Sequence, residues 1–451
     1  MESSLSMLPT AVSRVNIVIA IVLRASNDRG MNIVFFILIA GAFLVSSITE
    51  LTSGGAMEAL GAAALKAATD SVPLAFGLIG VMALFLGLMK VIEAGGALKS
   101  LARLLSPVLC RLFPEIPKNH PALGAMVMNV SANVLGLGNA ATPFGIRAME
   151  QLQSLNPRKD TASNSQVLFL TINTASITLI PTGVIALRAT SGSTNPAAVV
   201  VPTLAATFVT MIIAIVVARM LQRFFPVGEH STHEPTEQQQ SLMKPEDVEH
   251  LEPYPMWVGI TVLAVIVALI SVMVAFGDKA GHWLIPTLIV GLLAFGLYKK
   301  VRIYEMFVEG AKEGFQIAVK IIPYLVAILV AVAMFRTSGA MEMIMGPLGQ
   351  LLAPLGLSSE ALTMAGMRTL SGSGAFGLLA SYMSDPAVGV DSYKGILLGT
   401  IYGSSETTFY VLAVYFGSVG IRRIRHALAA GLIADVVGLL AAVFFCSILI
   451  N

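Results

Sequence analysis

Charged side chains are scarce in this sequence. Lys, Arg, Asp and Glu make up 12% of its 451 residues, whereas hydrophobic residues make up 56%. This balance is typical of a polytopic helical membrane protein and excludes an ordinary soluble enzyme. The net charge of +2 gives no indication of a nucleic-acid partner, so the lipid bilayer is the first partner that we expect.

Cysteine and histidine are also rare. The two cysteines, Cys110 and Cys446, lie far apart in sequence, which excludes a disulfide framework and a cysteine metal site. His230 and His233 stand three residues apart, but in a polar stretch where solvated histidines are expected. The sequence has no GxxxxGK(S/T) phosphate loop and no zinc-protease histidine pair. We therefore expect no catalytic residues, no bound metal and no cofactor.

Residues 403–408 (GSSETT) interrupt an apolar run that extends from about residue 395 to 419. A run of this length is typical of a membrane span. Glu406 therefore lies where a charge is costly, and ionisable residues inside spans usually mark a path for a substrate, an ion or a proton. Glu406 is our first candidate functional residue. The alternative is a structural carboxyl that is protonated or paired with an arginine.

A second copy of this pattern lies in the first half of the chain. Residues 171–178 (TINTASIT) align without gaps with residues 400–407 (TIYGSSET). Further upstream, and after a short gap, Ser131 aligns with Ser371. The sequence therefore indicates an internal duplication.

About nine segments are long and apolar enough to be predicted as transmembrane helices. Two more, 121–146 and 360–382, are rich in small residues and are predicted as re-entrant hairpins, which a bilayer tolerates only where protein or water covers the backbone. Residues 304–315 are predicted as an amphipathic interfacial helix. The predicted fold is an all-α polytopic membrane protein with two inverted repeats. Its predicted spans are approximately 32–48, 74–92, 165–187, 196–222, 254–276, 283–298, 318–336, 393–416 and 427–449.

Lys and Arg predict the orientation of the two halves. They flank the first hairpin, whereas the matching parts of the second half, 339–367 and 383–392, contain neither residue. By the positive-inside rule, the regions around the first hairpin lie in the cytoplasm and those around the second lie outside. The halves then cross the membrane in opposite directions, as in many secondary transporters. A parallel repeat is the alternative.

Composition divides the chain into four parts. An N-terminal extension covers 1–30, a first half 31–222, a polar linker 223–253 and a second half 254–451. The linker composition is typical of a flexible segment. The extension has no clear signal-peptide cleavage site, and Met31 is the natural first residue if the extension arose from an upstream start. The predicted orientation puts the N-terminus and the linker in the cytoplasm.

Several long motifs occur in the two halves. In the first half they are 113–121 (FPEIPKNHP), 128–143 (MNVSANVLGLGNAATP) and 173–181 (NTASITLIP). In the second half they are 335–340 (FRTSGA), 368–374 (RTLSGSG) and 403–410 (GSSETTFY). The first set resembles spore-maturation protein A and the second resembles spore-maturation protein B. The resemblance covers nearly the whole chain from Met31 onward, with the two proteins fused through the linker.

This resemblance implies a pair of gate, or nucleoside-recognition, domains. Similar domains occur in concentrative nucleoside transporters and in the membrane part of the ferrous-iron transporter B. In spore-forming relatives the two proteins are associated with spore-core dehydration, whereas a fused form suggests a bacterium that need not sporulate. The resemblance implies a multi-pass protein of the bacterial cytoplasmic (inner) membrane, and it supplies no substrate.

Each half offers a hairpin with hydroxyl or amide side chains and a span broken by polar residues. Most of these side chains can both donate and accept hydrogen bonds, and neighbouring glycines let backbone approach a ligand closely. Together they suit a small polar solute, although a single Ser or Thr can instead serve helix packing. The predicted substrate-binding residues are Asn129, Ser131, Asn133, Asn139, Thr142, Asn173, Thr174, Ser176, Thr178, Arg368, Ser371, Ser373, Ser404, Ser405, Glu406, Thr407, Thr408 and Tyr410.

Charged residues in or near the predicted spans are predicted to have three different roles. Arg368 can clamp a carboxylate or phosphate, pair with Glu406, or anchor the second hairpin at an interface. Asp435, inside the last span, is predicted with Glu406 to couple transport to an ion, H+ or Na+, and its alternative is a structural carboxyl. Arg188 and Arg336 lie near span ends and are predicted as interface anchors.

The sequence therefore predicts a secondary transporter that moves a small polar or charged solute by alternating access around a midplane site. Two alternatives remain at this point. One is a channel or metal-ion permeation protein, and the other is a non-transporting membrane scaffold for envelope or spore maturation. A homo-oligomer is possible in each case.

Overall fold

The computed structural model describes residues 29–117, 120–136, 138–225 and 278–450, together with five single residues between 255 and 264. Predictions for the extension, most of the linker and the span at 254–276 therefore lie outside the described residues. The described part is almost entirely helical. In the first half its helices are α2 (Arg29–Ser53), α3 (Ala56–Ala94), α4 (Ala97–Leu112), α5 (Pro121–Val134), α6 (Gly138–Leu155), α7 (Asn164–Thr174), α8 (Thr182–Thr190), η1 (Pro196–Val199), α9 (Val200–Leu221) and η2 (Gln222–Phe224).

The second half is also helical in its described residues. Its helices are α12 (Asp278–Tyr298), α13 (Ile303–Thr337), α14 (Ala340–Leu352), η3 (Ala353–Leu355), α15 (Ser359–Leu370), α16 (Gly372–Met383), α17 (Tyr393–Gly403), α18 (Thr408–Ser418) and α19 (Ala427–Leu449).

Four helices of the described residues are long and apolar enough to cross a membrane. They lie within Phe35–Ser53, Ala56–Ala94, Pro196–Phe224 and Ala427–Leu449. Large apolar side chains such as Phe36, which is 70% exposed, cover their outer surfaces, and lipid is the solvent in which such a surface is stable. The chain is therefore a helical membrane protein.

Both predicted hairpins are pairs of helices. In the first, His120 caps α5 by accepting a hydrogen bond from the Ala122 N–H at 3.2 Å, and Pro121 occupies the first helical position. In the second, Ser371 is extended between α15 and α16, and its side chain caps α16 by accepting from the Gly374 N–H at 3.1 Å. One residue thus ends one helix and starts the next.

The predicted spans at 165–187 and 393–416 are each interrupted. The first contains α7 and α8, separated by residues 175–181, and the second contains α17 and α18, separated by residues 404–407. Pro181 explains the first interruption because proline has no N–H for a helical hydrogen bond and its ring clashes with the preceding turn. The second interruption contains no proline, so other contacts must hold it.

The two broken helices run antiparallel. At one end, the backbone N–H of Arg423, which follows α18, donates to the carbonyl of Asp160, which precedes α7, at 2.9 Å. At the other end, Arg188 of α8 donates to the carbonyl of Val390 at 2.6 Å and to the carboxylate of Asp391 at 2.9 Å, just before α17. Each broken helix therefore begins beside the end of the other.

Arg188 is not an interface anchor. Its side chain is 0% exposed and its guanidinium is paired with Asp391. The interface prediction was wrong because a counter-charge from the other half of the chain lets this arginine be buried. Arg336 also forms an ion pair, with Asp385 at 2.5 Å, but it stays partly exposed.

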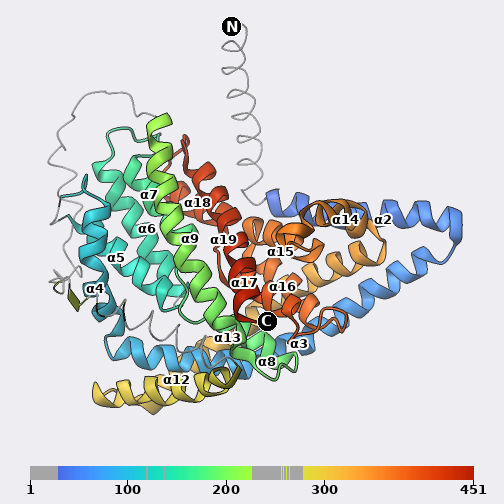
Figure 1. The fold of residues 1–451 in the computed structure, drawn as a ribbon, viewed down its shortest axis with the longest axis horizontal. Coiled ribbons are helices and arrows are strands. Elements are labelled where there is room, and N and C mark those ends of the chain that lie inside the picture. The colour runs from blue at the N-terminus through green and yellow to red at the C-terminus, as the bar shows by residue number, and fades with distance from the viewer. Residues whose placement is uncertain are drawn as a thin grey trace, which may run out of the picture.

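The second part of each broken helix packs against the hairpin of the other half. Leu412 and Tyr415 of α18 share an apolar cluster with Met126 of α5. Val184 of α8 shares another apolar cluster with Leu378 of α16. In Figure 1 the teal α5–α7 group lies on one side and the orange α14–α16 group on the other, with α9, α17 and α19 between them.

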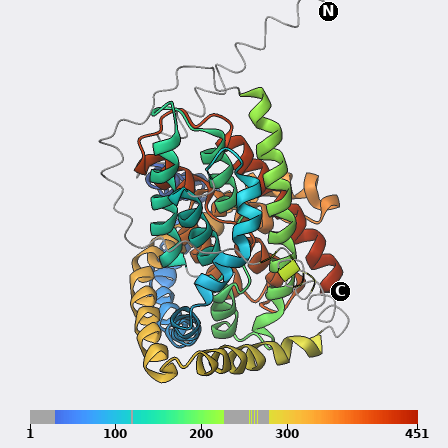
Figure 2. The same cartoon turned by 90° about the vertical axis from the view of Figure 1, so that its left-hand side faces the viewer.

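The long helices α3 and α13 pack closely along one side of this arrangement. The sequence predicted an interfacial helix at 304–315 and a separate span at 318–336, but the structure has one continuous helix, α13. Gly310 and Gly314 explain the difference, because they let α13 approach the backbone of α3 and give its first half a protein partner. Figure 2 shows α12 (yellow) lying across one end of the molecule.

We predict that Gly310→Ala destabilises the protein. A Cβ atom at this position would lie 2.6 Å from the Cβ of Lys90 and 2.9 Å from the Cα of Gly87. Overpacking of this kind costs about 1–3 kcal/mol, so the melting temperature in detergent should fall. Gly80→Ala in α3 is the control, since nothing lies within 4 Å of its added Cβ. Equal melting temperatures for both variants would show that the helices can separate at no cost.

Candidate functional site

The two broken helices meet at their interruptions. The N–H of Glu406 donates to the carbonyl of Thr174, the last residue of α7, at 3.0 Å. An unpaired backbone N–H or carbonyl costs free energy wherever water is excluded. The N–H of Glu406, in the interruption between α17 and α18, thus pairs with the free carbonyl at the end of α7. We take this contact as the centre of the candidate site.

Arg368 of α15 holds the second interruption in place. Its Nε donates to the carbonyl of Ser405 at 2.8 Å, and one terminal nitrogen bonds to the same carbonyl. The other terminal nitrogen donates to Thr407 Oγ1 at 3.2 Å, and the guanidinium lies 4.5 Å from the ring centroid of Tyr402. Because most of its donors are engaged within the protein, Arg368 positions the backbone. The side chain is 8% exposed, which does not fit an anchor at an interface.

Glu406 presents the accessible charge of the site. Its side chain is 46% exposed, although its backbone is fixed by Thr174. One carboxylate oxygen lies 3.4 Å from a terminal nitrogen of Arg368. The residue also directly precedes Thr407, the N-cap of α18, where the partial positive charge of a helix N-terminus favours an anion. The structure thus holds a carboxylate that a solute can reach.

Amide side chains of the first half form the other side of the crossing. Asn133 donates to Asn173 Oδ1 at 2.9 Å, which joins α5 to α7. Asn129 donates to the hydroxyl of Tyr415 at 3.1 Å, and this hydroxyl donates to Asn173 Oδ1 at 3.3 Å. The first hairpin, α7 and α18 are therefore connected by one hydrogen-bond network.

Two buried acceptor groups near this network are unsatisfied within the described residues. They are Asn129 Oδ1 and Ser131 Oγ, and both residues are 0% exposed. Buried polar atoms normally have a partner. They are therefore positions where water or a polar ligand can be bound.

Asp435 contacts the start of α18 from α19. Thr408 Oγ1 donates to one of its carboxyl oxygens at 2.8 Å. The helices approach closely here because α19 has Gly431 at the contact: an added Cβ there would lie 2.7 Å from the Thr408 methyl group. Asp435 thus contacts Thr408, the residue after the N-cap Thr407, and Glu406 is the residue before this N-cap.

The other predicted residues divide into two groups. Some support local structure: Thr174 and Ser404 donate to carbonyls of their own helices, and Ser371 caps α16 while lying 3.4 Å from Ser373. Others are placed without a bond to the network: Ser176 is buried, Thr142 and Thr178 are half-buried, and Tyr410 is 53% exposed. The side chain of Asn139 lies outside the described residues.

Tyr415 is a site residue that the sequence did not indicate. It lies in an apolar helix where an aromatic residue is ordinarily part of the core. Gly145 of α6 makes room for its ring, since an added Cβ would lie 2.8 Å from the ring carbon Cε1. A glycine facing an aromatic residue 270 positions later cannot be recognised from a single sequence.

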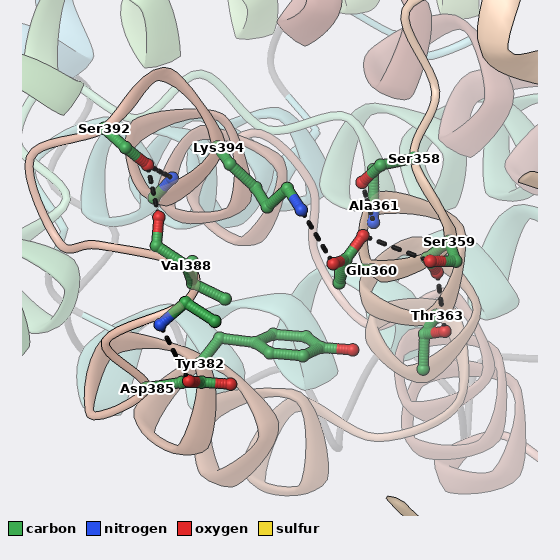
Figure 3. Close-up of polar contacts among 12 residues, drawn as sticks. Ser358, Ser359, Glu360, Ala361, Thr363, Tyr382, Asp385, Val388, Ser392 and Lys394 are labelled. Atoms are coloured by element: carbon green, nitrogen blue, oxygen red, sulfur yellow. Dashed lines mark hydrogen bonds and ion pairs between the residues drawn. The ribbon is translucent and has the colours of Figure 1, made fainter. Parts of the chain in front are cut away.

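The base of the second hairpin is tied to the start of α17. Figure 3 shows Lys394 of α17 reaching across to Glu360 of α15, and their charged atoms are 2.8 Å apart. Burial alone would raise the pKa of the Glu360 carboxyl, but the hydrogen bond from Lys394, its own backbone N–H and Ser358 lower this pKa to about 2. Arg368 and this ion pair thus fix the hairpin to the same broken helix at two places.

Comparison with known proteins identifies the family of this chain. A family model described as nucleoside recognition, named Gate, matches residues 75–191 and 318–422, which include both hairpins and both broken helices. Spore maturation protein A of Bacillus subtilis (strain 168) is 44% identical over 165 residues, which are 37% of this chain and 84% of that protein. Spore maturation protein B of the same organism is 44% identical over 172 residues, which are 37% of this chain and 96% of that protein.

This chain belongs to the family of spore maturation proteins A and B. The family predicted from the motifs is confirmed, and the two partial matches are consistent with a fused spore maturation protein A/B. Two solved structures of CNTnw are also similar. One is of an intermediate state (16% identity, TM-score 0.41, covering 99% of this chain and 87% of that one). The other is of an outward-facing state (15%, 0.39, 99% and 86%).

We predict that Tyr415→Phe lowers the stability of the protein. Loss of the hydroxyl removes the bonds to Asn129 and Asn173 at a buried position, and an unsatisfied buried group costs about 1–3 kcal/mol. The melting temperature in detergent should fall by several degrees. Tyr410→Phe on the same helix is the control, because that side chain is 53% exposed. If both variants melt together, the network carries no stability.

A second prediction concerns pH. A lowered pKa of Glu360 stabilises the folded protein above the unfolded value near 4.5, and the stabilisation is lost as pH falls toward about 2. Lys394→Gln removes the main partner, so it should melt below the wild type at neutral pH. The difference should shrink as pH falls through this window. Lys66→Gln, an exposed lysine of α3, should show neither effect, and a difference independent of pH would contradict the ion pair.

Proposed function

We propose that this protein is a secondary membrane transporter whose solute binds where the two broken helices meet. The observation that carries this proposal is the carboxylate of Glu406: it is 46% exposed, while its backbone is bonded to Thr174 of the opposite half. A charge is costly inside a membrane protein and is kept mainly where it acts. Broken helices that meet in this way are characteristic of transporters built from inverted repeats.

The chemistry of the site favours a solute that carries hydrogen-bond donors or a positive group. Glu406 offers an anion, and the interruption exposes it beside the N-terminus of α18. Arg368 is occupied by Ser405 and Thr407, so it contributes little to binding an anionic solute. The solute class that we propose is therefore small and polar, neutral or cationic, with several donors.

The packing supplies a route for alternating access. The α18 helix packs with the first hairpin and α8 packs with the second, so each hairpin moves with part of the other repeat. The α3 and α13 helices pack through glycines along one side. We propose that the hairpins and the ends of the broken helices move against this helix pair and open the site to each side in turn.

Nucleosides are the first solutes to test. The matching family model is described as nucleoside recognition, and a nucleoside has several hydroxyl and amine donors but no fixed negative charge. Spore maturation, the process named for the relatives, identifies no solute. A channel or metal-ion pathway and a membrane scaffold are the alternatives that the experiment must separate.

We predict that one solute class stabilises the wild type and fails to stabilise Glu406→Gln. Purified protein would be melted with nucleosides, amino acids, short peptides, organic acids and cations in turn. A ligand of the folded state raises stability by about 2.7 kcal/mol at a hundredfold excess over its dissociation constant. The class that stabilises would then be tested by counterflow in proteoliposomes.

Glu342→Gln is the matched control, since it removes one exposed carboxylate from the first turn of α14. It should bind like the wild type. Stabilisation by metal cations alone, with cation conductance in liposomes, would favour the channel. No stabilisation of the wild type by any class, together with full biological activity of Glu406→Gln, would favour the scaffold.

A further inference from the structure

Asp435 is a half-buried acid of α19 that forms no ion pair in the described part of the chain. Thr408 Oγ1 donates to one carboxyl oxygen at 2.8 Å. The other oxygen, Oδ1, is shielded from solvent and has no hydrogen-bond partner. Among the ion pairs of the described residues, none includes Asp435. A carboxylate in this position would lack most of the contacts that make a buried charge tolerable.

Among the described helices, none packed against α19 forms an ion pair with Asp435, although the positive charge of Arg368 acts on it electrostatically. Five elements pack against α19: α7, α9, α15, α17 and α18. The α7 and α18 sequences contain no Lys, Arg, Asp or Glu, and neither does α19 apart from Asp435. The charged residues of α9, α15 and α17 have other partners. Arg219 of α9 is bonded to the carbonyl of Leu112, and Lys394 of α17 is paired with Glu360 of α15. Arg368 of α15 is bonded to the carbonyl of Ser405 and paired with Glu406.

We propose that Asp435 is the proton-binding site of this protein and that it binds H+ rather than Na+. This deepens the proposed transport function and rests on it. Binding is a simple protonation: the carboxylate takes one proton and becomes a neutral carboxylic acid. A sodium ion would need a shell of several oxygen atoms, whereas the side-chain oxygens that the structure places against Asp435 are the hydroxyl of Thr408, which bonds to it at 2.8 Å, and that of Thr369 of α15.

The position of Thr408 explains how a proton would act on the solute site. Thr408 is the first residue of α18 and lies two residues after Glu406. Gly431 lets the Thr408 side chain contact α19 directly. Ionised Asp435 is a stronger acceptor for the Thr408 hydroxyl than the neutral acid. Gain or loss of the proton therefore alters the contact that holds the start of α18, and with it the backbone that presents Glu406.

The test is infrared spectroscopy of the protein in membranes over a pH series, which requires no knowledge of the solute. The carbonyl stretch of a neutral carboxylic acid is separate from the carboxylate and amide bands. Near neutral pH the wild type should show this band, and Asp435→Asn should lack it. Asp70→Asn, a variant of an exposed acid in α3, should keep the band. If Asp435→Asn fails to fold, loss of the neutral-acid band from the wild type as the pH rises still shows that a carboxylic acid of the folded protein releases a proton.

Melting temperatures provide the second measurement. A carboxyl that is neutral in the folded state and ionised in the unfolded state loses stability as pH rises above about 4. Asp435→Asn, which imitates the neutral acid, should therefore match the wild type near pH 4 and melt several degrees above it near pH 8. These arms do not depend on transport, so failure of the solute screen leaves them interpretable.

Two results would overturn the proposal. One is the absence of a neutral-acid band at every pH at which the wild type is folded. The other is a wild type that sodium chloride stabilises over potassium chloride while Asp435→Asn gains nothing, because this would make the group a sodium site. A pH-dependent band with no effect of sodium supports the proton.

Discussion

The hydrogen bond from the Glu406 N–H to the Thr174 carbonyl joins the two places where α7 and α17 end inside the molecule. Away from water, each open helix end leaves backbone groups that cost free energy unless they are paired. The protein meets this requirement by letting one interruption satisfy the other and by binding the Ser405 carbonyl with Arg368. Polar side chains gather at the crossing because irregular backbone needs them, and the accessible carboxylate lies among them.

The same crossing makes the two halves mechanically dependent on each other. Tyr415 of α18 reaches into the first hairpin and bonds to Asn129, while Val184 of α8 lies in an apolar cluster with Leu378 of the second hairpin. A displacement of either hairpin must therefore carry part of the other half of the chain with it. Close packing transmits such a displacement because interiors have few voids to absorb it.

Local features of the fold could be predicted from the sequence, and long-range pairings could not. The hairpins follow from runs of small residues, and the interruption before α8 follows from Pro181, because both signals are contained in a few neighbouring residues. The all-α fold and the family were predicted on the same basis and are confirmed. The predicted number of spans, inverted repeat, orientation, domain boundaries and ligand-binding roles remain predictions.

The errors and omissions have a common cause. Arg188 was predicted as an interface anchor because it lies near the end of a predicted span, whereas its actual partner, Asp391, is 203 residues away in sequence. Tyr415 was overlooked because its partners Asn129 and Asn173 are on other helices. A long side chain can be placed only when the residue opposite it is known, and one sequence does not give that residue.

The ion pair between buried Arg188 and exposed Asp391 also bears on why the two halves share one chain. Each residue comes from a different half, and Arg188 is 0% exposed. Without the second half, Arg188 would lose its counter-charge, and removing one partner of a buried charge is strongly unfavourable. The covalent connection between the halves keeps each at a high effective concentration near the other. Its contribution is therefore to assembly: it guarantees equal numbers of the two halves and makes their meeting intramolecular.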